Sequence, residues 1–170
     1  EADKIRLMVH SFESGKTEYM TPDFDQNVGG LKFSNDDKWI YFVSDFHAVD
    51  NIYKINLADK AIKQITSGVH DYTSVDFAEG GKLIAQNMSM SHPIEIWSVD
   101  EKTQEQKKIS TCNDELMAKI KWGKVEERWF KATDGKDLQT WVIYPPDFDS
   151  TKSYPTLLYC EGGPQSTVSQ

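Results

Sequence analysis

An internal repeat is the feature of this sequence that most constrains its fold. A forward shift of 44 residues places Phe33 on Phe77 and Ile40 on Ile84. The segments that coincide under the same shift are 30–40 with 74–84, 52–56 with 96–100, and 64–66 with 108–110. One offset that holds across separate apolar clusters predicts two copies of one structural unit.

Each unit of the repeat is predicted to contain four short antiparallel strands. Its apolar clusters alternate with polar residues and are rich in β-branched and aromatic side chains, and no stretch has capped helical spacing. Turn residues separate the clusters at 35–37 and 56–60, and again at 79–81 and 100–104. Four strands in a unit of this length are typical of a β-propeller blade.

The repeat predicts two complete blades, at 28–67 and 71–111, preceded by half a blade at 5–21. A blade has two apolar faces and requires a neighbour on each, and two and a half blades cannot close a ring. We therefore expect the chain to be part of a longer protein. Its open strand edges also predict self-association.

A different pattern follows the second blade. Residues 112–124 are predicted to be a linker, because Lys119 and Lys121 fall where the repeat requires apolar side chains. Two strands are then expected, at 128–132 and 138–144, joined at Asp134 and Gly135 by a type I′ turn.

A nearly continuous apolar run follows at 154–160. It predicts a strand of the kind that is buried on both faces of an α/β sheet. Cys160 ends this run and is expected to be a small buried side chain, and its separation from Cys112 matches no zinc or thioredoxin spacing.

The order of these elements resembles the junction region of the prolyl oligopeptidase family of serine peptidases, nearest to its dipeptidyl-peptidase and acylaminoacyl-peptidase branches. The motifs that carry the resemblance are propeller blades, Asp134 and Gly135, the run 144–148, the run 154–159 and Gly162-Gly163-Pro164. The resemblance implies a mainly β chain of antiparallel blades, with residues 125–170 as the first strands of an α/β-hydrolase domain. It also implies hydrolysis of short peptides by a Ser-Asp-His triad, with no cofactor.

In this family the loop at Glu161, Gly162, Gly163 and Pro164 would supply part of the oxyanion hole, because glycines allow close approach of backbone N–H groups to a carbonyl. The alternative is that the loop only ends a strand. Glu161 departs from the family pattern, since an ionised carboxylate accepts hydrogen bonds and cannot stabilise an oxyanion. We expect the backbone amides of the loop to suffice; the alternative is another role for Glu161, such as pairing with a substrate ammonium group.

The nucleophile is missing from these 170 residues. They contain no Gly-x-Ser-x-Gly elbow, and neither Ser166 nor Ser169 is followed by the required glycine. The chain by itself is therefore predicted to be inactive, with no catalytic residue of its own. A non-catalytic propeller binding module, a periplasmic translocation-accessory propeller and a related ester hydrolase remain alternatives.

Two further groups of residues have features of binding sites. Asp45 and His47 fall in a loop between the second and third strands of a blade, where propellers bind substrate termini; a solvated loop is the alternative. An EF-hand-like start at 23–27 lacks the glycine and glutamate that calcium requires, and no histidines have metal-binding spacing, so no metal is expected.

Composition excludes other classes of protein. A net charge of −8 and a pI near 5.0 argue against nucleic-acid binding, and no apolar run is long enough to span a membrane. The N-terminal residues do not form a signal peptide. A periplasmic or secreted location is expected from the resemblance alone.

Overall fold

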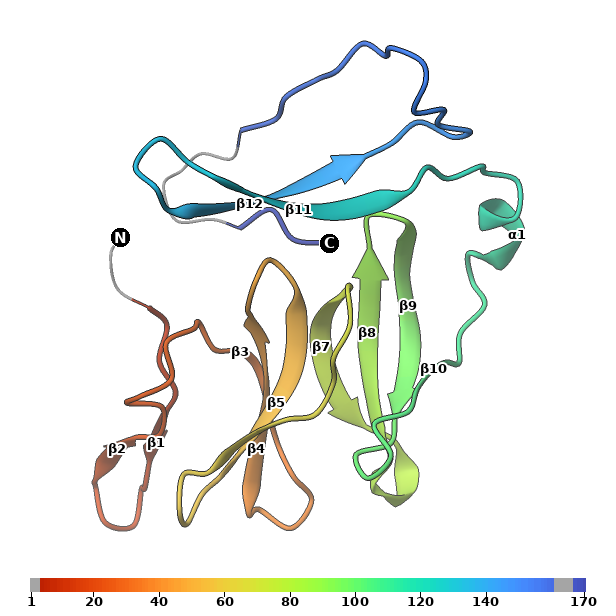
Figure 1. The fold of residues 1–170 in the computed structure, drawn as a ribbon. Helices are drawn as coiled ribbons and strands as arrows, with labels where there is room; N and C mark the ends of the chain where they lie inside the picture. The colour runs from red at the N-terminus through yellow and green to blue at the C-terminus, as the bar shows by residue number, and fades with distance from the viewer. Residues whose placement is uncertain (1–3, 161–166) are drawn as a thin grey trace.

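The computed structural model describes residues 4–160 and 167–170, and its regular structure is almost entirely antiparallel β-sheet (Figure 1). The first blade contains β3 (Gly29–Phe33), β4 (Trp39–Asp45), β5 (Asp50–Asn56) and β6 (Ile62–Gln64) in that order. The second contains β7 (Asp71–Phe77), β8 (Leu83–Ser89), β9 (His92–Val99) and β10 (Gln106–Lys108). Two-stranded sheets are formed by β1 (Met8–His10) with β2 (Thr17–Tyr19) and by β11 (Val125–Lys131) with β12 (Asp137–Ile143). The two described helical segments are a 3-10 turn (Glu79–Gly81) and α1 (Asp114–Met117).

A hydroxyl group recurs in the structure with the period of the repeat. Thr66 accepts a hydrogen bond from the amide of Ile52 at 2.9 Å, and Ser110 accepts one from Ile96 at 2.8 Å. Thr21 has the same relation to the amide of Leu7 in the half-blade, at 3.1 Å. The hydroxyl thus ties the outer edge of each unit to the strand beside it, which supports the repeat at the level of single atoms.

The turn before the last strand of each blade is also repeated. Lys60 and Gln104, which are 44 residues apart, both have a φ of 59°. Asn56 and Asp100 begin these turns, and the side-chain oxygen of each accepts backbone N–H groups two and three residues ahead. These Asx turns reverse the chain without glycine.

Two apolar cores lie between the sheets of the half-blade and the two blades. Leu7, Met20, Val28, Ile40, Phe42, Tyr53 and Ile55 lie between the half-blade and the first blade. Tyr41, Ile52, Ile65, Tyr72, Val75, Leu83, Ala85 and Val99 lie between the two blades. Alternate side chains of β4 therefore enter opposite cores, and the first blade is covered on both faces. Burial of each large side chain contributes about 1.5–3 kcal/mol, so neighbouring blades stabilise one another.

The β11–β12 hairpin forms where the sequence predicts it, but its turn differs from the expected type. Gly135 has a φ of 83°, whereas Asp134 is not among the residues with positive φ. The amide of Gly135 donates to the carbonyl of Ala132 at 2.9 Å. The expectation of a type I′ turn is wrong: this is a longer loop in which Gly135 alone takes the left-handed conformation.

The strand expected at 154–160 is absent from the structure. These residues have no regular secondary structure, and the side chains of Leu157 and Leu158 are 99% and 86% exposed. Cys160 is exposed rather than buried. An apolar strand of this kind requires paired neighbours and cover on both faces, and the described residues supply neither here. No helix in the described part of the chain is long and apolar enough to cross a membrane.

Candidate functional site

The predicted substrate-binding residues lie at the end of the blades that faces the β11–β12 hairpin (Figure 1). Asp45 is the last residue of β4, and His47 lies in the turn that leads to β5. Glu161, Gly162, Gly163 and Pro164 lie outside the described residues, so their predicted role in an oxyanion hole stays a prediction.

Two more carboxylates join Asp45 at this end of the blades. Asp50 is its cross-strand partner on β5, and the amide of Asp50 donates to the carboxylate of Asp71 at 2.9 Å. Burial, followed by repulsion from Asp71 and Asp45, raises the pKa of Asp50 to about 6. Burial also raises the pKa of Asp71 above its ordinary value. These three residues, called the acidic cluster below, can favour a cationic ligand group.

Residues 167–170 lie between the acidic cluster and the hairpin (Figure 1). Thr167 donates to Asp45 at 3.5 Å, and the carboxylate of Asp71 accepts hydrogen bonds from the Ser169 hydroxyl and the Gln170 amide. The indole nitrogen of Trp141 donates to the carbonyl of residue 168 at 3.1 Å. Polar groups of the blades and of the hairpin therefore converge on an extended segment of backbone.

The sequence predicts Asp45 as a binding residue but does not indicate that Asp50 and Asp71 lie beside it. Reading 45–50 as one tight hairpin would have placed Asp50 opposite Asp45. Asp71 begins the next blade, so its approach depends on the packing between blades, which the sequence of either blade alone does not specify.

His47 contacts the hairpin rather than the acidic cluster. Its carbonyl accepts a hydrogen bond from the side-chain nitrogen of Gln139 at 2.6 Å. Its ring meets the indole of Trp129 edge to face, with the centroids 5.3 Å apart. The predicted pair Asp45 and His47 therefore lies at one end of the blade, but the two residues have different neighbours.

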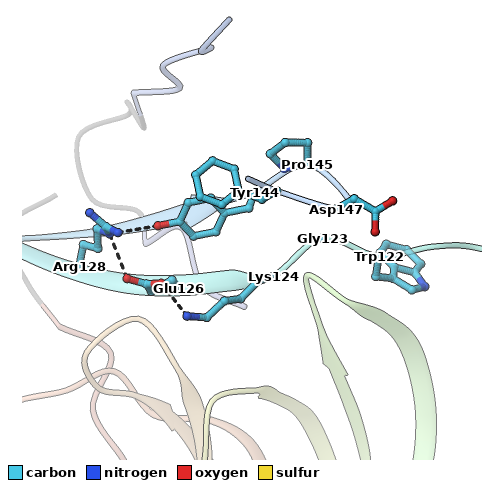
Figure 2. Close-up of a pocket in the computed structure, with 9 residues that line it drawn as sticks. Trp122, Gly123, Lys124, Glu126, Arg128, Tyr144, Pro145 and Asp147 are labelled. Atoms are coloured by element: carbon cyan, nitrogen blue, oxygen red, sulfur yellow. Dashed lines mark hydrogen bonds and ion pairs between the residues drawn. The ribbon is translucent and has the colours of Figure 1, made fainter. Parts of the chain in front are cut away.

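A pocket lies on the hairpin, where the linker meets its base (Figure 2). Its volume is about 450 Å³, and its lining is Trp122, Gly123, Lys124, Glu126, Arg128, Tyr144, Pro145, Asp147 and Phe148. Glu126 pairs with Lys124 at 2.7 Å and with Arg128 at 3.1 Å, and these contacts lower its pKa. Because Glu126 and Asp147 together match the two positive charges of Lys124 and Arg128, the lining of this pocket favours no charged class of ligand. Among the described residues, no group of three or more His, Cys, Asp or Glu side chains could hold a metal ion.

Comparison with known proteins was made by sequence and by structure. No family model matches the chain. It is 39% identical to dipeptidyl-peptidase 5 of Porphyromonas gingivalis over 100% of its own length and 25% of that protein. It also superposes on acylaminoacyl peptidase of Pyrococcus horikoshii, with a TM-score of 0.66 and 23% identity over 82% of this chain and 21% of that one. TolB from Acinetobacter baumannii gives a TM-score of 0.53 and 20% identity over 85% of this chain and 33% of that one.

The β-propeller domain of the Trilobed protease from Pyrococcus furiosus gives a TM-score of 0.53 and 20% identity over 66% of this chain and 33% of that one, which supports a propeller-type fold. The chain spans about a quarter of the length of the first dipeptidyl-peptidase relative that it matches. The sequence likeness extends through the linker, the hairpin and the loop at 161–164, and is not confined to the blades.

Proposed function

We propose that the chain is part of a serine exopeptidase of the prolyl oligopeptidase family that hydrolyses short peptides, because dipeptidyl-peptidase 5 of Porphyromonas gingivalis is similar to it over its whole length. The observation that carries this proposal is that the likeness continues past the blades. A propeller that served only as a binding module would continue its 44-residue repeat, whereas the relative shares the linker and hairpin that follow it.

In this proposal the blades restrict access to short peptides, and the acidic cluster binds the substrate's ammonium group. Asp45, which the sequence predicts for this role, would act together with Asp50 and Asp71. The raised pKa of Asp50 supports the assignment, because a nearby cation would relieve repulsion among the three carboxylates. His47 would contribute to the same rim through the β4–β5 turn.

The acyl-transfer step is proposed to use a serine, a histidine and an aspartate that these 170 residues do not supply as an elbow motif. The backbone amides of Gly162 and Gly163 would donate to the developing oxyanion, which is the largest single contribution such a loop makes. Glu161 would not take part as a donor. By itself the chain would then bind peptide without cleaving it.

The test is to express the longer natural protein and this chain separately, and to assay both with dipeptidyl and N-acyl chromogenic amides. We expect the longer protein to release dipeptides, a serine-directed phosphonate to abolish that activity, and this chain to be inactive. Cleavage of N-acyl substrates or esters alone would reassign the specificity. Absence of hydrolysis by the longer protein would favour the alternative of a non-catalytic propeller.

That alternative has one observation in its favour, the fold likeness to TolB. A non-catalytic module would bind peptide with unchanged affinity after phosphonate treatment, so calorimetry with a short peptide distinguishes the two functions. A periplasmic or secreted location, proposed from the family, can be tested by fractionating cells of the source.

Self-association is proposed from the exposed apolar residues of the chain. Leu157, Leu158 and Tyr159 are 75–99% exposed, and β10 lies at the outer edge of its sheet. Light scattering should give a mass above that of one chain as concentration rises. A single-chain mass throughout the concentration range would contradict this.

A further inference from the structure

The turn at 46–49, between β4 and β5, has an unfavourable backbone conformation. His47 and Ala48 have φ values of 53° and 54°, and a 3.0 Å backbone hydrogen bond closes the turn. Two successive left-handed residues make a type I′ turn, which favours Asn-Gly because a Cβ atom is disfavoured there. Met90 and Ser91, which form the corresponding turn between β8 and β9 in the second blade, are not among the residues with positive φ. The repeat itself therefore does not require this conformation.

The conformation presents His47 to the hairpin. Its carbonyl accepts the hydrogen bond from Gln139 at 2.6 Å, and its ring meets Trp129 edge to face at an interplanar angle of 72°. The ring is also stacked on Phe46, with centroids 3.9 Å apart. The backbone and the side chain of one residue thus contact the same partner surface.

The partner surface on the hairpin is also held in place by contacts within the hairpin. Trp129 and Gln139 are cross-strand partners in β11 and β12. One carboxylate oxygen of Glu127 accepts hydrogen bonds from the Trp129 indole at 2.6 Å and from the Gln139 side chain at 2.8 Å. Glu127 therefore orients both of the groups that His47 contacts.

We propose that His47 is a positioning residue that holds the β11–β12 hairpin in one orientation over the end of the first blade. The hairpin is the first element after the linker, so its orientation sets the direction in which the chain continues above the acidic cluster. This role does not depend on the proposed peptidase function. It also differs from the substrate-binding role that the sequence predicts for His47.

The test is hydrogen–deuterium exchange on the whole chain. Asn tolerates left-handed φ, so His47→Asn removes the ring contact and keeps the turn, while Gln139→Leu removes the hydrogen-bond donor. We expect both variants to exchange amide protons across 125–143 about three- to tenfold faster, the factor for loss of one aromatic pair in His47→Asn and of one hydrogen bond in Gln139→Leu. His47→Phe, which restores an aromatic ring, should return exchange to about the native rate.

Two matched variants serve as controls. Ala48→Gly relaxes the turn without touching the hairpin contacts, and His92→Asn changes a histidine near the equivalent turn of the second blade. Both should leave hairpin exchange unchanged. The proposal is overturned if His47→Asn and Gln139→Leu leave hairpin exchange unchanged. It is also overturned if exchange in β4 and β5 rises as much as in the hairpin, because His47 would then only stabilise its own blade.

Discussion

The backbone amide of Asp50 lies 2.9 Å from the carboxylate of Asp71 and donates a hydrogen bond to it across the boundary between the two blades. The same carboxylate receives hydrogen bonds from residues 169 and 170. The buried carboxylate of Asp71 in the second blade thus connects the first blade to residues 169 and 170. Asp50 contributes a second carboxyl group, and burial together with the charges of Asp71 and Asp45 raises its pKa.

This arrangement predicts an unusual pH dependence for Asp50→Asn. The folded-state pKa of Asp50 is raised to about 6, so the folded chain binds a proton more tightly than the unfolded chain. The contribution of Asp50 to stability therefore falls as pH rises from about 4 to 6. Removing the charge should stabilise the fold at pH 7 by on the order of 1–2 kcal/mol after allowance for solvent screening, and should change little at pH 4.

The measurement is urea unfolding of both proteins between pH 4 and pH 8. A matched control is Asp25→Asn, because Asp25 is a highly exposed carboxylate between the half-blade and the first blade. A stability difference between native protein and Asp50→Asn that does not vary with pH would contradict the assignment.

The repeated hydroxyl gives a second prediction. Thr66 is 1% exposed, accepts from the Ile52 amide and donates to Asn51 at 3.0 Å. Thr66→Val keeps the shape but leaves a buried donor and a buried acceptor unpaired, so it should cost about 1–3 kcal/mol of unfolding free energy.

Thr73→Val is the control for this prediction, because the Thr73 hydroxyl bonds Gln86 at an exposed position. Its effect should stay within about 0.5 kcal/mol. The measurement is the midpoint of thermal unfolding of each variant, which should be lower for Thr66→Val than for Thr73→Val. Equal midpoints would show that the Thr66 hydroxyl is dispensable.

The parts of the fold that sequence reasoning predicted are those set by local register. The 44-residue offset pairs Thr66 with Ser110 and Lys60 with Gln104, and the structure gives each pair the same backbone geometry. Strand alternation likewise predicts which side chains are buried, because each strand has only two faces.

The parts that sequence reasoning missed depend on contacts between distant segments. Asp71 completes the acidic cluster only because the second blade packs on the first. The run 154–160 has the composition of a buried strand, yet composition does not supply a neighbouring strand, and Leu157 is 99% exposed. The hairpin turn differs because Gly135 alone takes the left-handed conformation, which the Asp-Gly pair does not specify.

Glu95 gives a third prediction, on the attachment of the linker. Its carboxylate accepts hydrogen bonds from the Ser110 hydroxyl and from the backbone and side-chain nitrogens of Asn113, each of the latter at 3.0 Å. These hydrogen bonds lower the pKa of Glu95, and the one from Ser110 has the largest effect. Glu95→Gln replaces one acceptor oxygen by an N–H donor and should release the segment around α1.

We expect trypsin to cleave Glu95→Gln faster at Lys119 and Lys121, while the blades remain intact. In the native protein, protonation of Glu95 as pH falls through its lowered pKa should weaken the same attachment, because it removes the charge that the hydrogen bonds stabilise. Glu105→Gln changes an exposed glutamate in the same blade and should have no effect. If both variants are cleaved at the native rate, Glu95 does not anchor the linker.

Gly123 lies where the linker meets the hairpin, and it gives the last prediction. A Cβ atom at this position would lie 1.7 Å from the carbonyl oxygen of Tyr144, and both partners are backbone, so neither can move aside as a flexible side chain can. Lys124 beside it accepts a 2.9 Å hydrogen bond from the Tyr144 amide, which holds the two segments together. Gly123→Ala should therefore separate the linker from the base of the hairpin, at a cost of about 1–3 kcal/mol or more.

Gly29→Ala is the control, since a Cβ atom there meets nothing within 4 Å. Hydrogen exchange should rise in β11 and β12 for Gly123→Ala and stay at the native rate for Gly29→Ala; a native-like hairpin in Gly123→Ala would show that the close approach is not required.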